Sequence, residues 1–199
     1  MDAAALRERW GQPGDLAEKK VLRRLDAHCR RFISLSPFLA LGTSDAEGRH
    51  DVSPRGDAPG FVRVLDDTTL LIPDRPGNRR FDSLDNLARQ PYLALMFLLP
   101  GVDETLRING RGRFVDDPEL LVASAVNGRP PLSGLVVEIE ECFLHCGKAL
   151  IRSRLWDPET RIERRSFPPL ARIVADQIAG VDEQAAQAAI DHAYREKLY

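Results

Sequence analysis

The sequence predicts a mainly β fold, an antiparallel β-barrel with helices at both ends of the chain. Between residues 37 and 141, short apolar runs rich in leucine, valine and phenylalanine alternate with clusters of glycine, proline and aspartate, as strands alternate with turns. About six such runs occur, without the regular helices between them that a doubly wound parallel sheet requires. The 199 residues suffice for one domain with a sizeable core.

The segment before these runs predicts one amphipathic helix over residues 16–33. Apolar side chains recur there at helical spacing, and charged residues fall between them. Asp15 is in position to cap the first turn. The apolar stripe consists of Leu22, Leu25, Cys29 and Phe32.

The central runs carry turn signals where hairpins are expected. Residues 45–48 begin with aspartate and end with glycine, and residues 66–67 are both aspartate, as in tight turns. Two helical insertions are also expected. One follows residues 77–78, and the other begins at residues 117–118, where a proline suits the first helical turn.

Two of the runs differ in how their polar side chains are distributed. PYLALMFLLP, residues 91–100, is apolar on both faces, so we expect it in the barrel core or under a helix or a partner subunit. TLRINGRGRFV, residues 105–115, alternates instead. One face of this run carries Leu106, Ile108 and Gly110, and the other carries Arg107, Asn109, Arg111 and Arg113. The polar face is either solvated or in contact with a polar ligand.

The last part of the chain predicts further helices. Residues 169–199 are rich in alanine, and Asp182 is in position to cap a helix that follows it. If the preceding segment CGKALIRSRLWDPETR is helical, Lys148, Arg152 and Trp156 share one side of it. The chain therefore divides into an N-terminal helical segment, 1–34, a barrel, 35–156, and a C-terminal helical segment, 157–199.

Composition and charge argue against several classes of function. A net charge of −2 does not suit a nucleic-acid partner held by bulk charge. The N-terminus lacks the apolar core of a signal peptide, and no run reaches the roughly 18 apolar residues of a membrane span, so we expect a cytoplasmic protein away from the membrane. The GxSxG and HExxH motifs of many hydrolases are missing from the sequence.

The three cysteines predict neither a disulfide framework nor a metal site. Their odd number fits a reducing compartment. Cys142, His145 and Cys146 are spaced like part of a zinc site, but no fourth ligand stands at a familiar spacing. We therefore expect reduced, buried thiols and no bound metal.

The strongest site signal is the segment IPDRPGNRRFDSLDN, residues 72–86, in which a β run ends in a turn and two arginines open a helix. The first helical turn has unpaired N–H groups and the positive end of the helix dipole, and both stabilise an anion. Arg79 and Arg80 add guanidinium groups that match phosphate oxygens, and Asn78 can cap the helix or donate to the ligand. The alternative is a pair of solvated surface arginines. The segment thus predicts a phosphate site.

These signals occur in the order found in a known family. The chain resembles the pyridoxamine 5′-phosphate oxidase-like flavoproteins, the split β-barrel family that binds FMN, and particularly its bacterial branch of unassigned substrate. The matching pieces are LDAHCRRFISLSPFLALGT, DVSPRGDAPGFVRV, LLIPDRPGNRRFDSLDNL, ETLRINGRGRF and FLHCGKALIRSRLW. The resemblance implies a six-stranded antiparallel split β-barrel and a single FMN-binding domain over residues 1–199.

The resemblance also implies a homodimer with two FMN molecules, each in a groove between subunits, and it assigns the cofactor contacts residue by residue. The strand along the edge of the isoalloxazine ring is matched by Ser53, Pro54, Arg55 and Gly56. The strand end beside it is matched by Ile72 and Pro73, and the phosphate clamp by Asn78, Arg79 and Arg80. A strand that contacts the flavin from the barrel wall or the partner is matched by Thr105, Arg107 and Asn109. A C-terminal segment near the groove is matched, more loosely, by Lys148, Arg152, Ser153 and Trp156.

Two departures from the family pattern bear on function. The second basic residue of the clamp is Arg80, where the parent oxidases commonly carry lysine, so the charge is kept while the geometry changes. The parent oxidases end in a tryptophan-and-arginine pattern that helps to hold the flavin and pyridoxamine phosphate. This chain instead continues past LWDP into an alanine-rich helix, so we do not expect pyridoxamine phosphate oxidase activity.

The function implied by the resemblance is FMN-dependent oxidation or reduction of an unknown small molecule, with NAD(P)H as a candidate electron donor. A positive charge near N1 and O2 of the ring stabilises reduced flavin, and Arg55 or Arg107 is the expected source. One alternative is a flavin-binding carrier or sensor without turnover. Another is a haem-binding or haem-degrading relative of the same barrel. Its axial ligand would come from the four histidines, His28, His50, His145 and His192.

Overall fold

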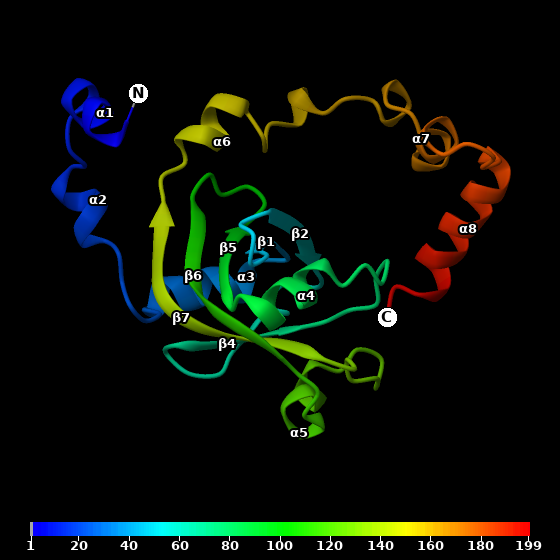
Figure 1. Cartoon of the computed structure of the whole chain (residues 1–199), viewed down its shortest axis with the longest axis horizontal. Coiled ribbons are helices and arrows are strands. Elements are labelled where there is room, and N and C mark those ends of the chain that lie inside the picture. Colours follow the sequence, from blue (N-terminus) through cyan, green and yellow to red (C-terminus); the bar gives the residue numbers. More distant parts are fainter. Residues whose placement is uncertain (1) are drawn as a thin grey trace.

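Seven antiparallel strands form one curled sheet in the computed structural model, which describes residues 2–199. The order across the sheet is β2-β1-β5-β6-β7-β4-β3, so β2 and β3 are its two edges. The strands are β1 (Phe38–Ser44), β2 (His50–Gly56), β3 (Arg63–Val64), β4 (Thr69–Pro73), β5 (Tyr92–Leu98), β6 (Thr105–Val115) and β7 (Gly134–His145). Figure 1 shows β5, β6 and β7 curving around a common centre, with α4 in front of them. The predicted mainly β fold with flanking helices is confirmed.

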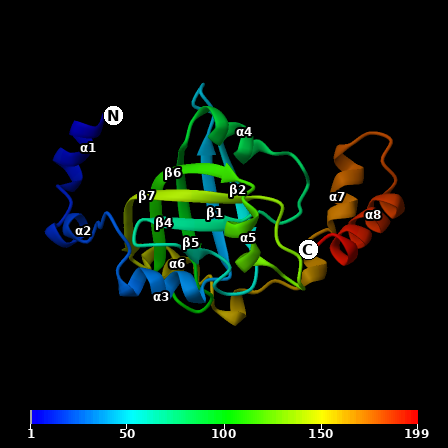
Figure 2. The ribbon, with the colours of Figure 1, turned by 90° about the horizontal axis from the view of Figure 1, so that it is seen from below.

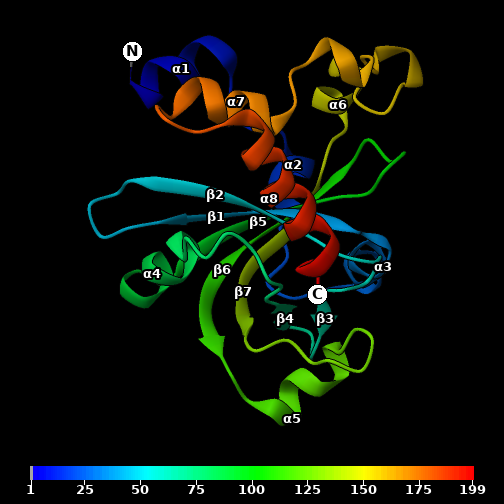
Figure 3. The ribbon, with the colours of Figure 1, turned by 90° about the vertical axis from the view of Figure 1, so that its right-hand side faces the viewer.

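The seventh strand comes from one of the six predicted runs. FVRVLDDTTLLIP contains its own hairpin, in which β3 pairs with β4 across the turn predicted at residues 66–67. The turn predicted at 45–48 joins β1 to β2 and is closed by a backbone hydrogen bond from Asp45 to Arg49. Both turn predictions are therefore confirmed. In Figure 3 the β1–β2 hairpin projects beyond the rest of the sheet.

Eight α-helices and three short 3-10 turns surround the sheet in the described part of the chain. The helices are α1 (Ala3–Trp10), α2 (Asp15–Lys19), α3 (Ala27–Leu35), α4 (Asp82–Arg89), α5 (Pro118–Leu121), α6 (Lys148–Ser153), α7 (Leu170–Gln177) and α8 (Glu183–Glu196). The 3-10 turns are η1 (Val122–Ser124), η2 (Pro158–Thr160) and η3 (Arg164–Ser166). Figures 1 and 2 place α1 and α2 on one side of the barrel and α7 and α8 on the other. No helix within residues 2–199 has the length and apolar character needed to cross a bilayer.

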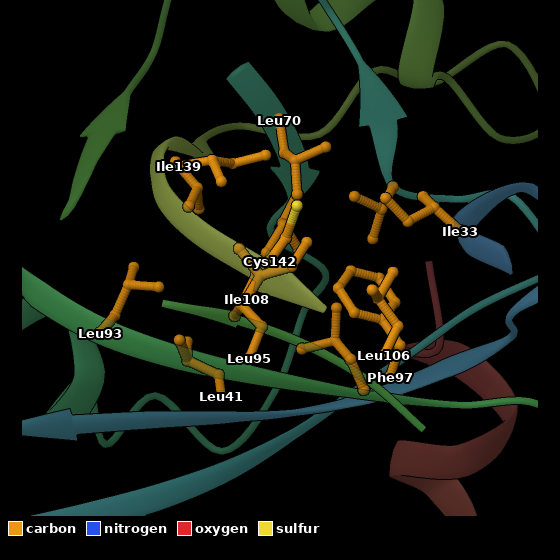
Figure 4. Close-up of a cluster of buried hydrophobic side chains, with 14 of the residues drawn as sticks. Ile33, Leu41, Leu70, Leu93, Leu95, Phe97, Leu106, Ile108, Ile139 and Cys142 are labelled. Carbon is orange, nitrogen blue, oxygen red and sulfur yellow. The ribbon is translucent and has the colours of Figure 1, made fainter. Parts of the chain in front are cut away.

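The core lies inside the curled sheet. Every second side chain of β5 and β6 points inward, where Leu95, Phe97 and Ile108 are almost fully buried. Cys29 and Ile33 of α3 belong to the same cluster, part of which Figure 4 shows. The alternation predicted for residues 105–115 is confirmed, because leucine, isoleucine and glycine point inward while arginine and asparagine point outward.

The prediction of one helix over residues 16–33 was wrong. The chain forms α2 and α3 separately, and the segment between them pairs with β7. Leu22 exchanges two backbone hydrogen bonds with Cys142, of 2.9 and 2.8 Å. Asp26 then caps α3 by accepting a hydrogen bond from the N–H of Cys29 at 2.8 Å. A contact between residues far apart in the sequence thus overrides the local periodicity.

The helix predictions at 117–118 and 182 are confirmed at their starts, whereas other helix boundaries are shifted. α5 begins at Pro118 as expected, and Asp182 caps α8 by accepting from Ala185 N–H at 2.8 Å. α6 ends at Ser153, so Trp156 lies beyond the helix and not on its side.

The two longest strands, β6 and β7, meet at a β-bulge. Their register shifts between Asn109 and Gly110, where Glu140 is left without a partner residue on β6. At this point the backbones approach closely, because a Cβ atom on Gly110 would lie 2.0 Å from the carbonyl oxygen of Glu138. Only glycine fits such a position without moving the neighbouring strand.

The three cysteines differ in their surroundings. Cys29 and Cys142 are buried in the core, whereas Cys146 is exposed. Burial, together with hydrogen bonding to Asp26, raises the pKa of Cys29 to about 12. Burial also raises the pKa of Cys142. At neutral pH both buried groups are therefore thiols and not the reactive thiolates.

We expect a disulfide reagent such as dithionitrobenzoate to modify one thiol of the native protein quickly and all three after denaturation. Counting the released chromophore in both states measures this. In the control variant Cys146→Ser, the fast reaction should disappear. Rapid labelling of Cys29 or Cys142 in the native state would contradict the buried placement.

Candidate functional site

Side chains, and not a backbone ladder, connect the edge strand β2 with the region of β4, the strand next to the other edge. Two ion pairs join the end of β2 to the residues after β4. Arg55 Nη1 lies 2.7 Å from Asp74 Oδ1, and Arg75 Nε lies 2.6 Å from Asp57 Oδ2. We call these four residues the seam. Their charges alternate along each segment, since arginine precedes aspartate at the end of β2 and follows it after β4.

The seam is largely shielded from solvent. The side chains of Asp57 and Arg75 are only 3% and 17% exposed. Burial raises the pKa of Asp57, but hydrogen bonds from Ala58 N–H, Arg75 and Tyr199 outweigh it, and the pKa lies below its ordinary value. The carboxylate therefore stays charged at neutral pH.

Arg55 has an unused donor in the seam. Its side chain points to the inner side of the sheet, because Arg55 pairs with the buried Leu39 of β1. Asp74 accepts from Nη1, whereas Nε is buried and finds no hydrogen-bond acceptor in the described structure. A buried N–H without a partner is costly, and a bound ligand or water could supply the acceptor.

The loop from the seam to α4 carries the predicted phosphate residues. Asn78 accepts a hydrogen bond from the backbone N–H of Arg80 at 3.1 Å, and Arg80 Nε pairs with Asp82 at 2.7 Å. Arg79 has no carboxylate partner within residues 2–199. Its φ of 60°, like that of Phe81, lies in the left-handed region that such side chains rarely adopt. The backbone of this loop is therefore held at two positions in a conformation that costs free energy.

The prediction that the two arginines open a helix was wrong in its boundary. α4 begins at Asp82, and its N-cap position is Phe81, so Asn78 does not cap it. The first turn of α4 carries Asp82 and Asp85. These carboxylates occupy the positive end of the helix dipole, so an anion would have to be held by the arginine side chains in front of the helix.

A pocket of about 460 Å³ lies between the β1–β2 hairpin and α4. Its wall mixes four carboxylates with three guanidinium groups, and Arg80 is the only one of the predicted site residues that lines it. The lining residues are Asp45, Arg49, His50, Asp51, Arg80, Asp82, Asp85, Asn86 and Arg89. Asn86 is anchored by a 3.0 Å hydrogen bond to Thr43 of β1, which fixes α4 against the hairpin.

The structure separates the predicted strand residues into two groups. Ser53 and Arg55 point inward, since they pair with buried residues of β1. Pro54 belongs to the outer face, where the ladder continues through Met96 to Arg107. Arg107 and Arg55 of one chain therefore lie on opposite sides of the sheet.

The outer face of β6 and β7 holds its polar residues in local contacts. Asn109 donates to Glu141 Oε1 at 2.5 Å, and the guanidinium carbon of Arg107 lies 5.1 Å from the centre of the Phe143 ring. Thr105 starts the same strand and is buried. None of these three predicted residues touches the seam.

The α6 segment also lies apart from the seam and the loop. Trp156 donates to the carbonyl of Val102 in the β5–β6 connection at 2.9 Å, and Ser153 donates to Leu150 within its own helix. Lys148 and Arg152 are exposed. Within the described residues, no hydrogen bond or ion pair connects these four residues to β2 or to the loop before α4.

One chain thus brings the predicted residues at the ends of β2 and β4 together, and the loop with Arg79 and Arg80 follows β4 directly along the chain. Ile72 and Pro73 are buried at the end of β4, directly before Asp74 of the seam. Sequence reasoning missed Asp57, Asp74 and Arg75. A signal for them exists in the two tripeptides at the ends of these strands, RGD at the end of β2 and PDR at the end of β4, in which the order of the charges is reversed.

Comparisons with known proteins identify the family through its sequence model, which covers more than half of the chain. A family model described as pyridoxamine 5′-phosphate oxidase matches residues 25–146. No match is found among curated proteins. Several solved structures have a similar fold but share little sequence with this chain. HupZ of Group A Streptococcus is 14% identical, over 60% of this chain and 93% of that one, with a TM-score of 0.49. A putative pyridoxamine 5′-phosphate oxidase of Lactobacillus delbrueckii is 20% identical over 61% and 95%, with a TM-score of 0.48. An FMN-binding protein of Syntrophomonas wolfei is 13% identical over 72% and 96%, with a TM-score of 0.45.

Proposed function

We propose, because this chain belongs to the pyridoxamine 5′-phosphate oxidase family, that it binds FMN and exchanges electrons between the flavin and a small molecule. The observation that carries the proposal is the group of arginines at the seam and in the next loop. Arg55 has a buried Nε without an acceptor, and Arg79 has no carboxylate partner in the described structure. Both features fit a bound anionic ligand that supplies the missing acceptors.

In this proposal Arg79 and Arg80 hold the phosphate of FMN, with Asn78 fixing the loop. Asp82 already accepts one hydrogen bond from Arg80, so Arg79 supplies the larger part of the free donor capacity. Ile72 and Pro73 form the apolar wall next to the seam. Ser53 and Arg55 face the same side of β2 and are the polar groups that orient the ring.

FMN, when bound, supplies a ring that takes up and releases a hydride at N5. The residues of this chain contribute binding, orientation and charge. Arg55 is held by Asp74 in a partly buried position, where its positive charge acts more strongly than in water. A flavin ring bound near Arg55 would therefore be stabilised when it accepts electrons and becomes negatively charged. We assign no catalytic residue.

We further propose a homodimer in which the outer faces of the sheets meet. The outer face of β1, β2 and β5 is mostly apolar, and Val52, Tyr92 and Met96 are its exposed large hydrophobic side chains. A second copy seated there would cover the doubly apolar run 91–100. Pro54 and Gly56 of β2, and Arg107 and Asn109 of β6, would then serve the partner's flavin or the interface, since they lie on this outer side.

The dimer proposal predicts that Met96→Glu raises the dissociation constant about a hundredfold or more, because it places an unpaired charge twice in a twofold interface. Light scattering coupled to size-exclusion chromatography at several concentrations measures this. Val122→Glu, in the exposed η1 turn, is the control and should leave the mass unchanged. A Met96→Glu protein that stays dimeric would place the interface elsewhere.

The visible absorption spectrum of the protein purified in native buffer tests the main proposal. The released chromophore is identified by chromatography against FMN, FAD and riboflavin. FMN near one per chain supports the proposal, and reduction by NADH or NADPH then separates an enzyme from a carrier without turnover. A haem spectrum, or a colourless protein that takes up no added FMN, overturns it.

A further inference from the structure

The α7–α8 hairpin makes one side-chain hydrogen bond to the barrel among residues 2–199. Its other side-chain hydrogen bonds and ion pairs stay within the hairpin, as between Arg172 and Glu183. α8 buries none of its residues, and α7 buries only Ala171. The hairpin is therefore weakly attached to the barrel.

The contact is made by Tyr199, which follows α8. Its hydroxyl donates to Asp57 Oδ1 at 2.9 Å, and the guanidinium carbon of Arg75 lies 5.7 Å from the centre of its ring. Both interactions involve a charged partner, which strengthens them relative to neutral contacts. Figures 1 and 3 show α8 running down to the barrel, with the C-terminus beside it.

The place where Tyr199 docks is the seam itself. Asp57 follows Arg55 by two residues, and Arg75 follows Asp74, the partner of Arg55. Tyr199 is thus in direct contact with one ion pair of the seam, and the other pair holds the arginine with the unused Nε.

We propose that Tyr199 is a gating residue of the flavin site, and this inference rests on the proposed function. While the phenol is docked on Asp57 and Arg75, the α7–α8 hairpin covers the seam. When the contact breaks, the hairpin swings away and opens the route by which FMN and the second substrate enter and leave. The contact is weak enough to break often, since one hydrogen bond and one cation–π contact hold an otherwise exposed hairpin.

Two variants and a matched control test the gate. Tyr199→Ala removes both contacts, Tyr199→Phe removes only the hydroxyl, and Tyr194→Ala changes an exposed tyrosine on the same helix. The first readout is hydrogen exchange of the α8 amides in the full chain without FMN. We expect exchange about threefold to tenfold faster in Tyr199→Ala, an intermediate rate in Tyr199→Phe, and the wild-type rate in Tyr194→Ala.

The second readout is the release rate of FMN from the loaded protein, followed by the rise in fluorescence of the freed flavin. We expect release to accelerate about threefold to tenfold in Tyr199→Ala and to stay unchanged in Tyr194→Ala. Faster exchange with unchanged release overturns the gating role, and unchanged exchange overturns the contact itself. If the wild-type protein takes up no FMN, the proposed function fails and the gate fails with it. The hydrogen-exchange experiment tests only the Tyr199 contact, so the two failures can be told apart.

Discussion

Replacing Arg79 and Arg80 together by alanine is expected to weaken FMN binding about a hundredfold or more while leaving riboflavin binding unchanged. A hydrogen bond to a charged group contributes about 1.5–3 kcal/mol, and each 1.4 kcal/mol is a factor of ten in affinity. Arg80 is exposed and shares its Nε with Asp82, so its part lies at the low end. Riboflavin lacks the phosphate and should not sense the change.

Titrations of both flavins, followed by the quenching of flavin fluorescence, measure the two affinities. Arg89→Ala is the matched control, because Arg89 lines the same pocket as Arg80 but lies at the other end of α4. It should leave both affinities within about twofold. An equal loss for FMN and riboflavin in the double variant would show that these arginines hold the loop and not the phosphate.

Gly110→Ala is expected to destabilise the fold by about 3 kcal/mol or more, the upper end for overpacked positions. The added Cβ would lie 2.0 Å from the Glu138 oxygen and 3.0 Å from its carbonyl carbon, and these are backbone atoms of the neighbouring strand. Relief therefore requires β6 and β7 to move apart at the bulge, where the sheet has its longest strand pair.

Gly112→Ala, two residues along the same strand, is the matched control. Its Cβ would meet the ends of the Leu93 and Leu135 side chains, at 2.4 and 2.9 Å, and these ends can change rotamer. We expect a cost of about 1 kcal/mol, measured with Gly110→Ala by urea unfolding. An equal loss of unfolding free energy in the two variants would mean that the backbone at the bulge moves as easily as a leucine side chain changes its rotamer.

Local patterns were sufficient to predict much of the fold. The alternation in residues 105–115 depends only on the geometry of a strand, so it correctly identified which side of β6 is buried. The turns at 45–48 and 66–67 depend on the conformational preferences of a few residues and were equally accessible. The split between α2 and α3 was not, because the pairing of Leu22 with Cys142 joins segments far apart in the sequence.

The sequence was sufficient to predict which segments form the candidate site, but not the side of the sheet on which each residue lies. The loop with Arg79 and Arg80 was identified from its composition, whereas the start of α4 at Asp82 depends on a backbone turn that composition does not specify. Arg55 and Arg107 were expected in one role. Their separation onto opposite sides follows from the register across three intervening strand pairs, which no single strand contains.

The alternating charges of the seam specify how the end of β2 aligns with the segment that follows β4. With Arg55 opposite Asp74 and Asp57 opposite Arg75, both contacts are attractive. If one end slid along the other so that Arg55 met Arg75, two guanidinium groups would face each other in a poorly solvated place. Backbone hydrogen bonds look alike at every residue and would tolerate such a slide. The two segments thus recognise each other as two proteins do at an interface, because the order of their charges allows only one alignment.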